Sequence, residues 1–336
     1  MASCIAALGT GASGLRAAET VTNPLLTQRA DPHVYRDASG TYFATATVPE
    51  YDRIVLRGAK TLDGLRDAPE RVIWRKHDSG VMAAHIWAPE IHRIDGKWYV
   101  YFTAGRSDDI WAIRLYVLEN ASADPLQGEW LEKGQLETEF ESFSLDATTF
   151  EHRGQRYLLW TQRPLQPKGA GTDIYIARMK NPWTIDGPQV SISSPTLEWE
   201  TRGFKVNEAP AAIVRNGRVF VTYSASATDA NYCVGLLSAA ADAELVKAVS
   251  WSKSPLPVFR TSERHSQYGP GHNSFTVAED GKTDLFVYHA RQYARIEGDP
   301  LHDPNRHTRV QPFTWKGDGT PDFGEPVADG TLQLSR

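Results

Sequence analysis

The sequence predicts an all-β protein, a five-bladed β-propeller with four antiparallel strands in each blade. The first observation is an internal repeat. Five turns begin at a glycine and lead into an aromatic or aliphatic strand, at Gly40, Gly96, Gly154, Gly217 and Gly281. Successive glycines are about 56 to 64 residues apart, a period typical of propellers and solenoids with long loops. The repeat fills nearly the whole chain, which favours a single domain.

The second observation is the alternation of apolar and polar residues within each repeat. Segments such as Lys97 to Thr103, Asp173 to Ala177 and Arg218 to Tyr223 have the composition and length of β-strands. Each unit shows the same order, with one strand before the glycine turn and two or more after it. An alternative is a long β-sandwich, because glycine turns followed by aromatic residues occur in many hairpins.

Composition narrows the class of function. The chain has 336 residues and a net charge of −5, so it lacks the basic surface expected of a nucleic-acid or membrane-surface binder. It contains 10 Trp, 13 Tyr and 12 Phe, which suit both β-sheets and sugar binding. Two cysteines, Cys4 and Cys233, exclude a disulfide framework. These features favour a neutral substrate.

The chain divides into two segments of different composition. Residues 1–23 are small and weakly apolar, and we expect them to be a leader or partial signal segment without a fixed structure. Residues 24–336 form the predicted propeller domain. The signal-like segment predicts a secreted or periplasmic protein, although it lacks the basic residues of a complete signal peptide.

An ionisable residue stands eight or nine positions before four of the five repeat glycines: Asp31, Asp146, Glu208 and His272. The second unit has Ile86 to Glu90 at this point. If each unit is one blade, these positions lie on the five innermost strands and converge near the axis. Three carboxylates and a histidine would then share one cavity.

Three carboxyl groups in one cavity suit the hydrolysis of a glycosidic bond. One protonated carboxyl assists the leaving oxygen, and one ionised carboxylate activates water or attacks carbon. A third carboxylate raises the pKa of the acid by charge repulsion. A calcium site is the alternative use of grouped acids, but these residues lack the close spacing of a calcium loop. Each residue could also be a turn or core residue, as an Asp before Pro often is.

Five ordered motifs resemble glycoside hydrolase family 43. They are Arg29 to Tyr35, His85 to Glu90, Ser144 to Phe150, Val206 to Pro210 and Gly271 to Phe275. The resemblance covers residues 24 to about 330 and implies a five-bladed propeller that hydrolyses its substrate with inversion. It implies that Asp31 is the general base, that Glu208 is the general acid, and that Asp146 tunes and orients that acid. It places His272 near the axis, where family members hold a calcium ion largely through water. No cofactor is expected for the chemistry.

Substrate contacts are predicted from pocket chemistry and from the same resemblance. Trp87 occupies the second unit's equivalent of the acidic positions, where its ring could line a sugar subsite or pack between blades. Arg306 matches a family arginine that contacts the sugar, and Arg291 and Arg309 compete for that role. His33 and His85 are further candidates for the pocket wall.

The wider pattern resembles the exo-acting α-L-arabinofuranosidase branch of the family, through Thr47 to Arg53, Ile86 to His92 and Asn305 to Gln311. The resemblance implies release of L-arabinose from the non-reducing ends of α-1,5-linked arabinan or arabino-oligosaccharides. The long inserts Arg163 to Lys168 and Asp299 to Pro304 could wall off an exo-acting pocket. The alternatives are a β-xylosidase, an endo-arabinanase and a non-catalytic carbohydrate-binding propeller. We expect a monomer that binds a plant polysaccharide, without nucleic acid or membrane partners.

Overall fold

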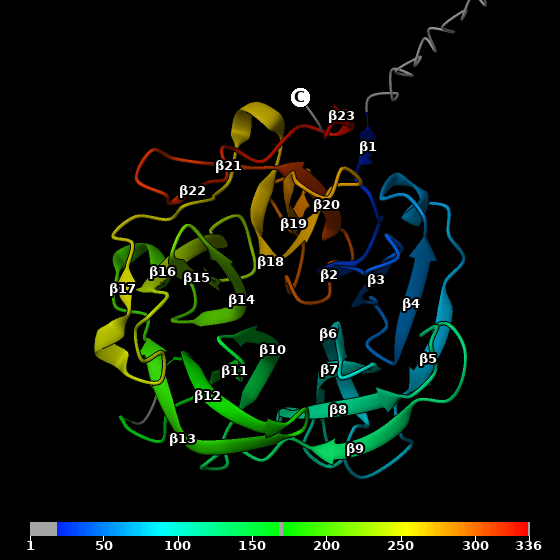
Figure 1. Ribbon diagram of the computed structural model, residues 1–336, viewed down its shortest axis with the longest axis vertical. Coiled ribbons are helices and arrows are strands. Elements are labelled where there is room, and N and C mark those ends of the chain that lie inside the picture. Colours follow the sequence, from blue (N-terminus) through cyan, green and yellow to red (C-terminus); the bar gives the residue numbers. More distant parts are fainter. Residues whose placement is uncertain (1–18, 168–170, 335–336) are drawn as a thin grey trace, which may run out of the picture.

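The computed structural model describes residues 19–167 and 171–334, which form five β-sheets around a central axis (Figure 1). Within each sheet the strands are antiparallel neighbours in chain order. The predicted five-bladed propeller is therefore confirmed. Among the described residues no helix is long and apolar enough to cross a membrane.

Four of the five blades have four strands, as predicted. Blade 1 contains β2 (Ala30–Arg36), β3 (Tyr42–Thr47), β4 (Arg53–Ala59) and β5 (Arg71–Arg75). Blade 2 contains β6 (Ala84–Ile94), β7 (Lys97–Gly105), β8 (Arg114–Asn120) and β9 (Leu131–Gln135). Blade 3 contains β10 (Ser144–His152), β11 (Gln155–Gln162), β12 (Asp173–Asn181) and β13 (Thr184–Ser193). Blade 4 contains β14 (Asn207–Arg215), β15 (Arg218–Ala225), β16 (Cys233–Ala240) and β17 (Ser252–Lys253).

The fifth blade departs from the predicted count and shows how the ring closes. Its sheet has three strands, β18 (Tyr268–Val277), β19 (Asp284–Arg291) and β20 (His307–Pro312). The outer edge of β20 is covered by the start of the chain. The backbone N–H of Thr308 donates to the Leu26 carbonyl at 2.9 Å. The Asn23 side chain donates to the Val310 carbonyl at 2.8 Å and accepts from the Val310 N–H at 2.9 Å. The ring is therefore closed by hydrogen bonds between the two ends of the chain.

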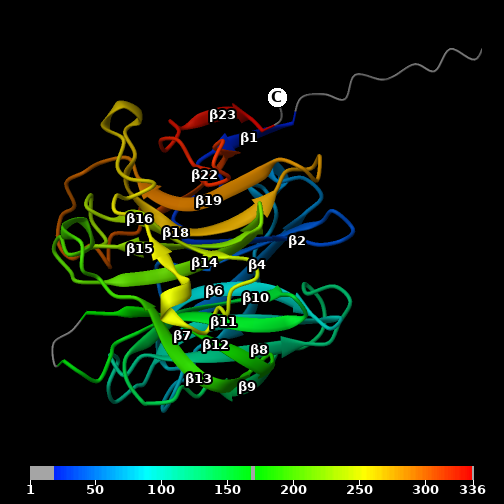
Figure 2. The ribbon, with the colours of Figure 1, turned by 60° about the vertical axis from the view of Figure 1, so that its left-hand side comes forward.

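The same closure moves the predicted domain boundary. Strand β1 (Thr20–Asn23) pairs antiparallel with β23 (Gly330–Gln333), and Figure 2 shows the two side by side. Residues 20–23 therefore belong to the propeller, and not to an unstructured leader as predicted. They are held by pairing with a strand that lies about 300 residues later in the chain, and the local composition of residues 20–23 does not reveal such a partner. Residues 1–18 of the predicted leader lie outside the described residues.

The remaining elements are short. They are β21 (Thr314–Trp315), β22 (Pro321–Asp322) and the 3₁₀ helices η1 (Asp63–Leu65), η2 (Glu198–Glu200), η3 (Ala248–Ser250) and η4 (Glu263–His265).

The hydrophobic core is divided among the interfaces between neighbouring blades. Five apolar clusters occur, and each joins residues from two adjacent sheets. One, for example, packs Ile54 of blade 1 against Trp98 of blade 2, and both side chains are fully buried. A sheet with two apolar faces needs cover on both, and a closed ring of sheets supplies it. This packing fixes the innermost strands around the axis.

Every innermost strand has a β-bulge. It lies at the level of the chain where the repeat places Asp31, Asp146, Glu208 and His272. The ladder between the first and second strand of each blade skips one residue on the inner strand. At each bulge one residue has left-handed backbone geometry: Asp31 (φ 52°), Ala88 (45°), Asp146 (56°), Ala209 (52°) and His272 (45°). A bulge bends the strand and re-aims its side chains. The five bulges thus form one ring of equivalent positions, in which Trp87 and Glu208 stand one residue before the left-handed residue.

Candidate active site

The bulge ring opens into a cavity of about 470 Å³. The predicted Asp31, Asp146, Glu208 and His272 all line it, although each comes from a different blade. Arg306, Trp87 and Tyr232 line it as well, together with the apolar side chains of Trp111, Phe143, Leu145, Phe204 and Leu301. The structure therefore brings together the four ionisable residues that the repeat singled out.

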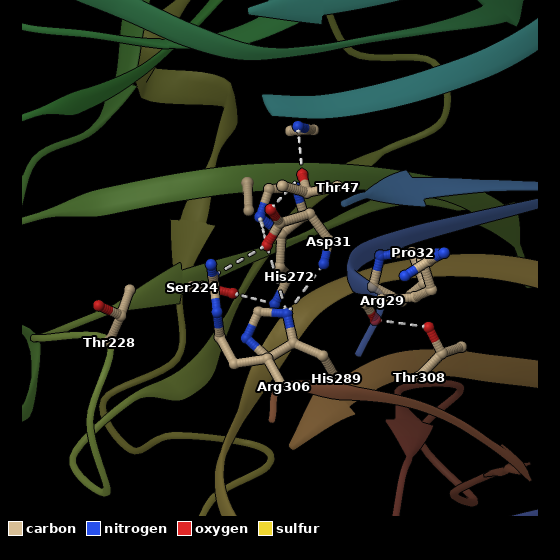
Figure 3. Close-up of polar contacts among 12 residues, drawn as sticks. Arg29, Asp31, Pro32, Thr47, Ser224, Thr228, His272, His289, Arg306 and Thr308 are labelled. Carbon is tan, nitrogen blue, oxygen red and sulfur yellow. Dashed lines mark hydrogen bonds and ion pairs between the residues drawn. The ribbon is translucent and has the colours of Figure 1, made fainter. Parts of the chain in front are cut away.

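Asp31 is held as an ionised carboxylate. Its Oδ2 accepts a hydrogen bond from the Thr47 hydroxyl at 2.6 Å. Its Oδ1 lies 3.2 Å from His272 Nδ1 and 3.4 Å from Arg306 Nη1 (Figure 3). Burial by itself would raise the pKa of Asp31, but the charges of His272 and Arg306 outweigh it and hold the pKa well below its usual range. The carboxylate is therefore available as a proton acceptor over a wide range of pH.

His272 supplies one of those charges. Burial alone would lower its pKa, but Asp31 and Asp146 raise the pKa to about 9. Its backbone N–H donates to Ser224 Oγ at 2.8 Å, which fixes the bulge. The side chain is therefore an imidazolium between two carboxyl groups.

The calcium ion predicted near His272 would need mainly oxygen ligands, which the prediction supplies largely through water. Among the described residues, no group of three His, Cys, Asp or Glu side chains that could share an ion includes His272. The calcium site stays a prediction, and no step of the chemistry below depends on it.

Glu208 and Asp146 form a buried carboxyl pair. The Tyr232 hydroxyl donates to Glu208 Oε1 at 2.6 Å. The N–H of Ala209, the residue after Glu208, donates to Asp146 Oδ2 at 3.1 Å, so Asp146 positions the Glu208 backbone. Burial raises the pKa of both groups, and the Glu208 charge raises the pKa of Asp146 further. The pair therefore retains a proton at a pH at which Asp31 has lost its own.

A second set of side chains, from four of the five blades, fixes bulges of the ring. The bulge N–H of Ala88 donates to Thr47 Oγ1, that of Asp146 to Thr103 Oγ1, and that of Asp31 to His289 Nδ1. The acceptors lie on the second strand of the preceding blade, seven or eight residues after each repeat glycine. The sequence analysis missed His289, although a hydroxyl residue at the matching place in the other four units marks the position. Because His289 Nδ1 accepts this bond and burial lowers its pKa to about 3, His289 is neutral.

Trp87, His85 and Arg306 lie at the cavity, though not all in the predicted manner. Trp87 lines the cavity and stacks on His85, with ring centroids 4.3 Å apart. His85 is not among the lining residues, and its Nδ1 lies 2.9 Å from the Ile110 carbonyl, so it supports Trp87. Arg306 is buried against Asp31 and donates to the Tyr51 hydroxyl at 3.2 Å. Its predicted sugar contact stays a prediction.

Two further predicted substrate contacts, Arg291 and His33, are corrected by the structure, because neither of them lines the active cavity, as was also found for His85. Arg291 is 2% exposed and donates to the carbonyls of Thr228 and Pro300 at 2.7 and 2.8 Å, so it ties loops together. His33 lies two residues beyond Asp31 on β2 and lines a different cavity. Both residues were predicted as substrate contacts from their residue type. Only the packing of the folded chain shows which loop or cavity each side chain reaches.

Tyr232 and Phe204 are cavity residues that the sequence analysis did not identify. Both belong to loops between strands, outside the repeated positions, so the internal repeat gave no signal for them.

The cavity combines the ionised carboxylate of Asp31, which two cationic side chains hold, with the pair of Asp146 and Glu208, which retains a proton. One group can accept a proton while the other supplies one, which is the requirement for general acid–base hydrolysis of a glycoside. Aromatic and apolar side chains around the mouth are suited to the faces of sugar rings.

Comparison with known proteins agrees with this chemistry. The model for glycosyl hydrolases family 43 matches residues 21–321. The chain is 63% identical over 316 residues to an extracellular exo-α-(1→5)-L-arabinofuranosidase of Streptomyces avermitilis, covering 94% of this chain and 65% of that protein. It is 60% identical over 280 residues to the Streptomyces chartreusis protein of the same name, covering 83% of this chain and 84% of that one.

A solved structure is similar over most of both chains. The crystal structure of the α-L-arabinofuranosidase from Lactobacillus brevis superimposes with a TM-score of 0.89 at 52% identity, covering 92% of this chain and 98% of that one. The chain spans about two thirds of the Streptomyces avermitilis relative, at 65%. The matched family model covers nearly all of the described residues, and this chain therefore belongs to glycosyl hydrolases family 43.

Proposed function

We propose that this protein is an inverting, exo-acting α-L-arabinofuranosidase that releases L-arabinose from the non-reducing ends of α-1,5-linked arabinan or arabino-oligosaccharides. The observation that carries the proposal is one cavity that holds the ionised Asp31 and the proton-retaining Asp146 and Glu208 pair. The names of the relatives supply the substrate class.

In the proposed reaction, Asp31 accepts a proton from a water molecule as the water oxygen bonds to the anomeric carbon. Glu208 donates its proton to the glycosidic oxygen as the bond from that oxygen to the anomeric carbon breaks. The products are a free sugar of inverted anomeric configuration and a shortened chain, and the two carboxyl groups exchange protons with solvent afterwards. His272 and Arg306 keep Asp31 ionised, while Asp146 and Tyr232 hold the Glu208 segment in place.

Two inserts support the exo mode of action. Arg163 and Leu301, from the inserts that were expected to wall off the pocket, both line the cavity. The Tyr51 hydroxyl donates to the Leu301 carbonyl, which joins that loop to the first blade. Such a wall admits a chain end and stops the chain beyond it.

We also propose that the protein is secreted, since both Streptomyces relatives are named extracellular. The chemistry proposed here requires no cofactor, and the expected monomer is tested by light scattering of the purified protein.

The test is chromatography of the products formed from linear α-1,5-arabino-oligosaccharides, beside a Glu208→Gln variant. Arabinose as the sole early product, absent with the variant, supports the exo mode and the acid. Early oligosaccharides would indicate an endo-arabinanase, and cleavage of nitrophenyl xyloside in preference to nitrophenyl arabinofuranoside would indicate a β-xylosidase. Proton NMR of the first arabinose formed distinguishes inversion from retention.

A further inference from the structure

A second cavity, of about 300 Å³, lies further along the innermost strands than the active cavity. It is lined by His33 of β2 and by Glu90 and His92 of β6. His33 and Glu90 each stand two residues beyond the bulge residue of their strand, Asp31 and Ala88. They therefore belong to the level of the axis next to the bulge ring, about 6 to 7 Å away at the rise of a β-strand.

The three side chains converge on one point. His92 Nε2 lies 3.1 Å and His33 Nε2 lies 3.6 Å from the same oxygen, Glu90 Oε2. One nitrogen or oxygen from each residue lies within 4.8 Å of the others. Two ligand atoms bound at 2.0 to 2.1 Å to one ion are separated by about 2.9 Å at a right angle and about 3.4 Å at the tetrahedral angle. The two separations from Glu90 Oε2 are already close to these values.

The chemistry of this cluster is incomplete without a cation. Glu90 is 6% exposed, and its ion-pair partners among the described residues are the two histidines. Both histidines line the cavity with Glu90, and each turns its Nε2 towards the same carboxylate oxygen. His33 is 9% exposed and its Nδ1 has no hydrogen-bond partner. A buried carboxyl group is stabilised by a cation beside it, and a buried polar atom without a partner often marks the place of a water or an ion.

We propose that His33, Glu90 and His92 bind one divalent transition-metal ion of the zinc class. Two imidazole nitrogens and one carboxylate oxygen are the donor set that zinc, cobalt and nickel accept, whereas calcium and magnesium require mainly oxygen ligands. Thr148 hydrogen-bonds the Glu90 carboxylate and would orient it as a ligand. The cavity leaves the remaining coordination positions to water and gives the ion a path of entry. The ion joins β2 to β6, and so fastens blade 1 to blade 2 at the axis.

The matched control is a His and Glu pair on the surface. His77 Nε2 lies 2.8 Å from Glu132 Oε1, closer than either pair in the cluster, but no third ligating side chain joins them in the described residues and both side chains are about one third exposed. If a close His and Glu pair sufficed, this surface pair would bind metal as well as the buried cluster. The proposal requires that it does not.

The experiment is calorimetric titration of tag-free, EDTA-stripped protein with Zn²⁺, followed by Co²⁺ titration read from its visible absorption. We expect one equivalent bound by the wild type and by His77→Gln, with affinity at least about tenfold lower in His92→Gln and in Glu90→Gln. The thermal unfolding midpoint should rise on addition of Zn²⁺ in the wild type and in His77→Gln, and not in His92→Gln. Circular dichroism of each metal-free variant verifies that it is folded.

The proposal is overturned if the wild type binds no Zn²⁺, or if His92→Gln and Glu90→Gln bind it as tightly as the wild type. It is also overturned if Ca²⁺ binds with one equivalent while Zn²⁺ does not, a result that would favour the ion predicted at His272. These readouts need no substrate, so they remain valid even if the proposed glycosidase activity fails.

Discussion

The innermost strands carry two levels of polar side chains. One is the bulge ring, and the other is the cluster of His33, Glu90 and His92, which begins two residues beyond the bulge residues. In the bulge ring, fixed cations accompany the carboxylates: His272 and Arg306 lie within 3.4 Å of Asp31. In the cluster, Glu90 Oε2 contacts the Nε2 atoms of two histidines, at 3.1 Å from His92 and 3.6 Å from His33. The comparison teaches that equally buried carboxyl groups differ in function according to their compensating charge. Asp31 is proposed as a base because cationic side chains accompany it, and Glu90 is proposed as an ion ligand because two histidines accompany it.

The sharpest test of this comparison is removal of the charge on Asp31. We expect Asp31→Asn to lower kcat about 10³-fold, because the amide cannot accept the proton of the attacking water. Steady-state kinetics on arabino-oligosaccharides measure the effect, with Asp67→Asn, an exposed residue of the same blade, as the control. If Asp31→Asn kept more than a tenth of the wild-type kcat, Asp31 would not be the general base.

Asp146→Asn tests the proton-retaining pair, with an expected loss in kcat of about 10²-fold. The amide oxygen still accepts from Ala209, so the backbone geometry is kept while the charge is lost. Because repulsion within the pair is mutual, loss of the Asp146 charge lowers the pKa of Glu208. The alkaline limb of the kcat/KM profile should therefore move to lower pH. A profile that keeps its alkaline limb would show that Asp146 acts through geometry alone.

His272→Gln removes a cation that faces all three carboxyl groups, and we expect a loss of about tenfold in kcat/KM at the optimum. Its charge lowers the pKa of Asp31, of Asp146 and of Glu208. Without it all three values rise, so both limbs of the pH profile should move to higher pH. Limbs that move in opposite directions, or do not move, would mean that His272 is uncharged in the enzyme.

The smallest effect is expected at the cavity mouth. Phe204 lines the cavity, yet it is 60% exposed, which suggests that its ring packs against the chain beyond the cleaved sugar. Phe204→Ala should raise KM about threefold for arabino-oligosaccharides and leave the kinetics on nitrophenyl arabinofuranoside close to wild type. Leu256→Ala, 69% exposed and away from the cavity, is the control. Equal losses on both substrates would place Phe204 at the cleaved sugar instead.

Much of the bulge ring was predictable because a propeller repeats its local geometry. The repeat glycines fix the register of each hairpin, so a residue eight or nine positions earlier falls at the same level in every blade. Asp31, Asp146, Glu208 and His272 were found in this way. An offset of seven or eight residues after the glycine leads to Thr47, Thr103, Ser224 and His289, so these hydrogen-bond acceptors could also have been predicted from the sequence.

The level of each side chain along the axis was not predictable. His33 and Asp31 are two residues apart, so regular strand alternation would assign both to one face of the strand and one pocket. In the structure His33 lines a separate cavity with Glu90 and His92. Arg291 illustrates the same limit, because its partners Thr228 and Pro300 come from two different loops.

By itself, the sequence determined the five repeating hairpins and the identity and common level of the three carboxyl groups, because turn chemistry and strand alternation act over a few residues. The tertiary structure alone decided which groups meet. It placed His272 and Arg306 against Asp31, Tyr232 against Glu208, and β1 against β23 at the far end of the chain. Those contacts set the pKa values and close the ring, and they depend on packing between blades that no local pattern encodes.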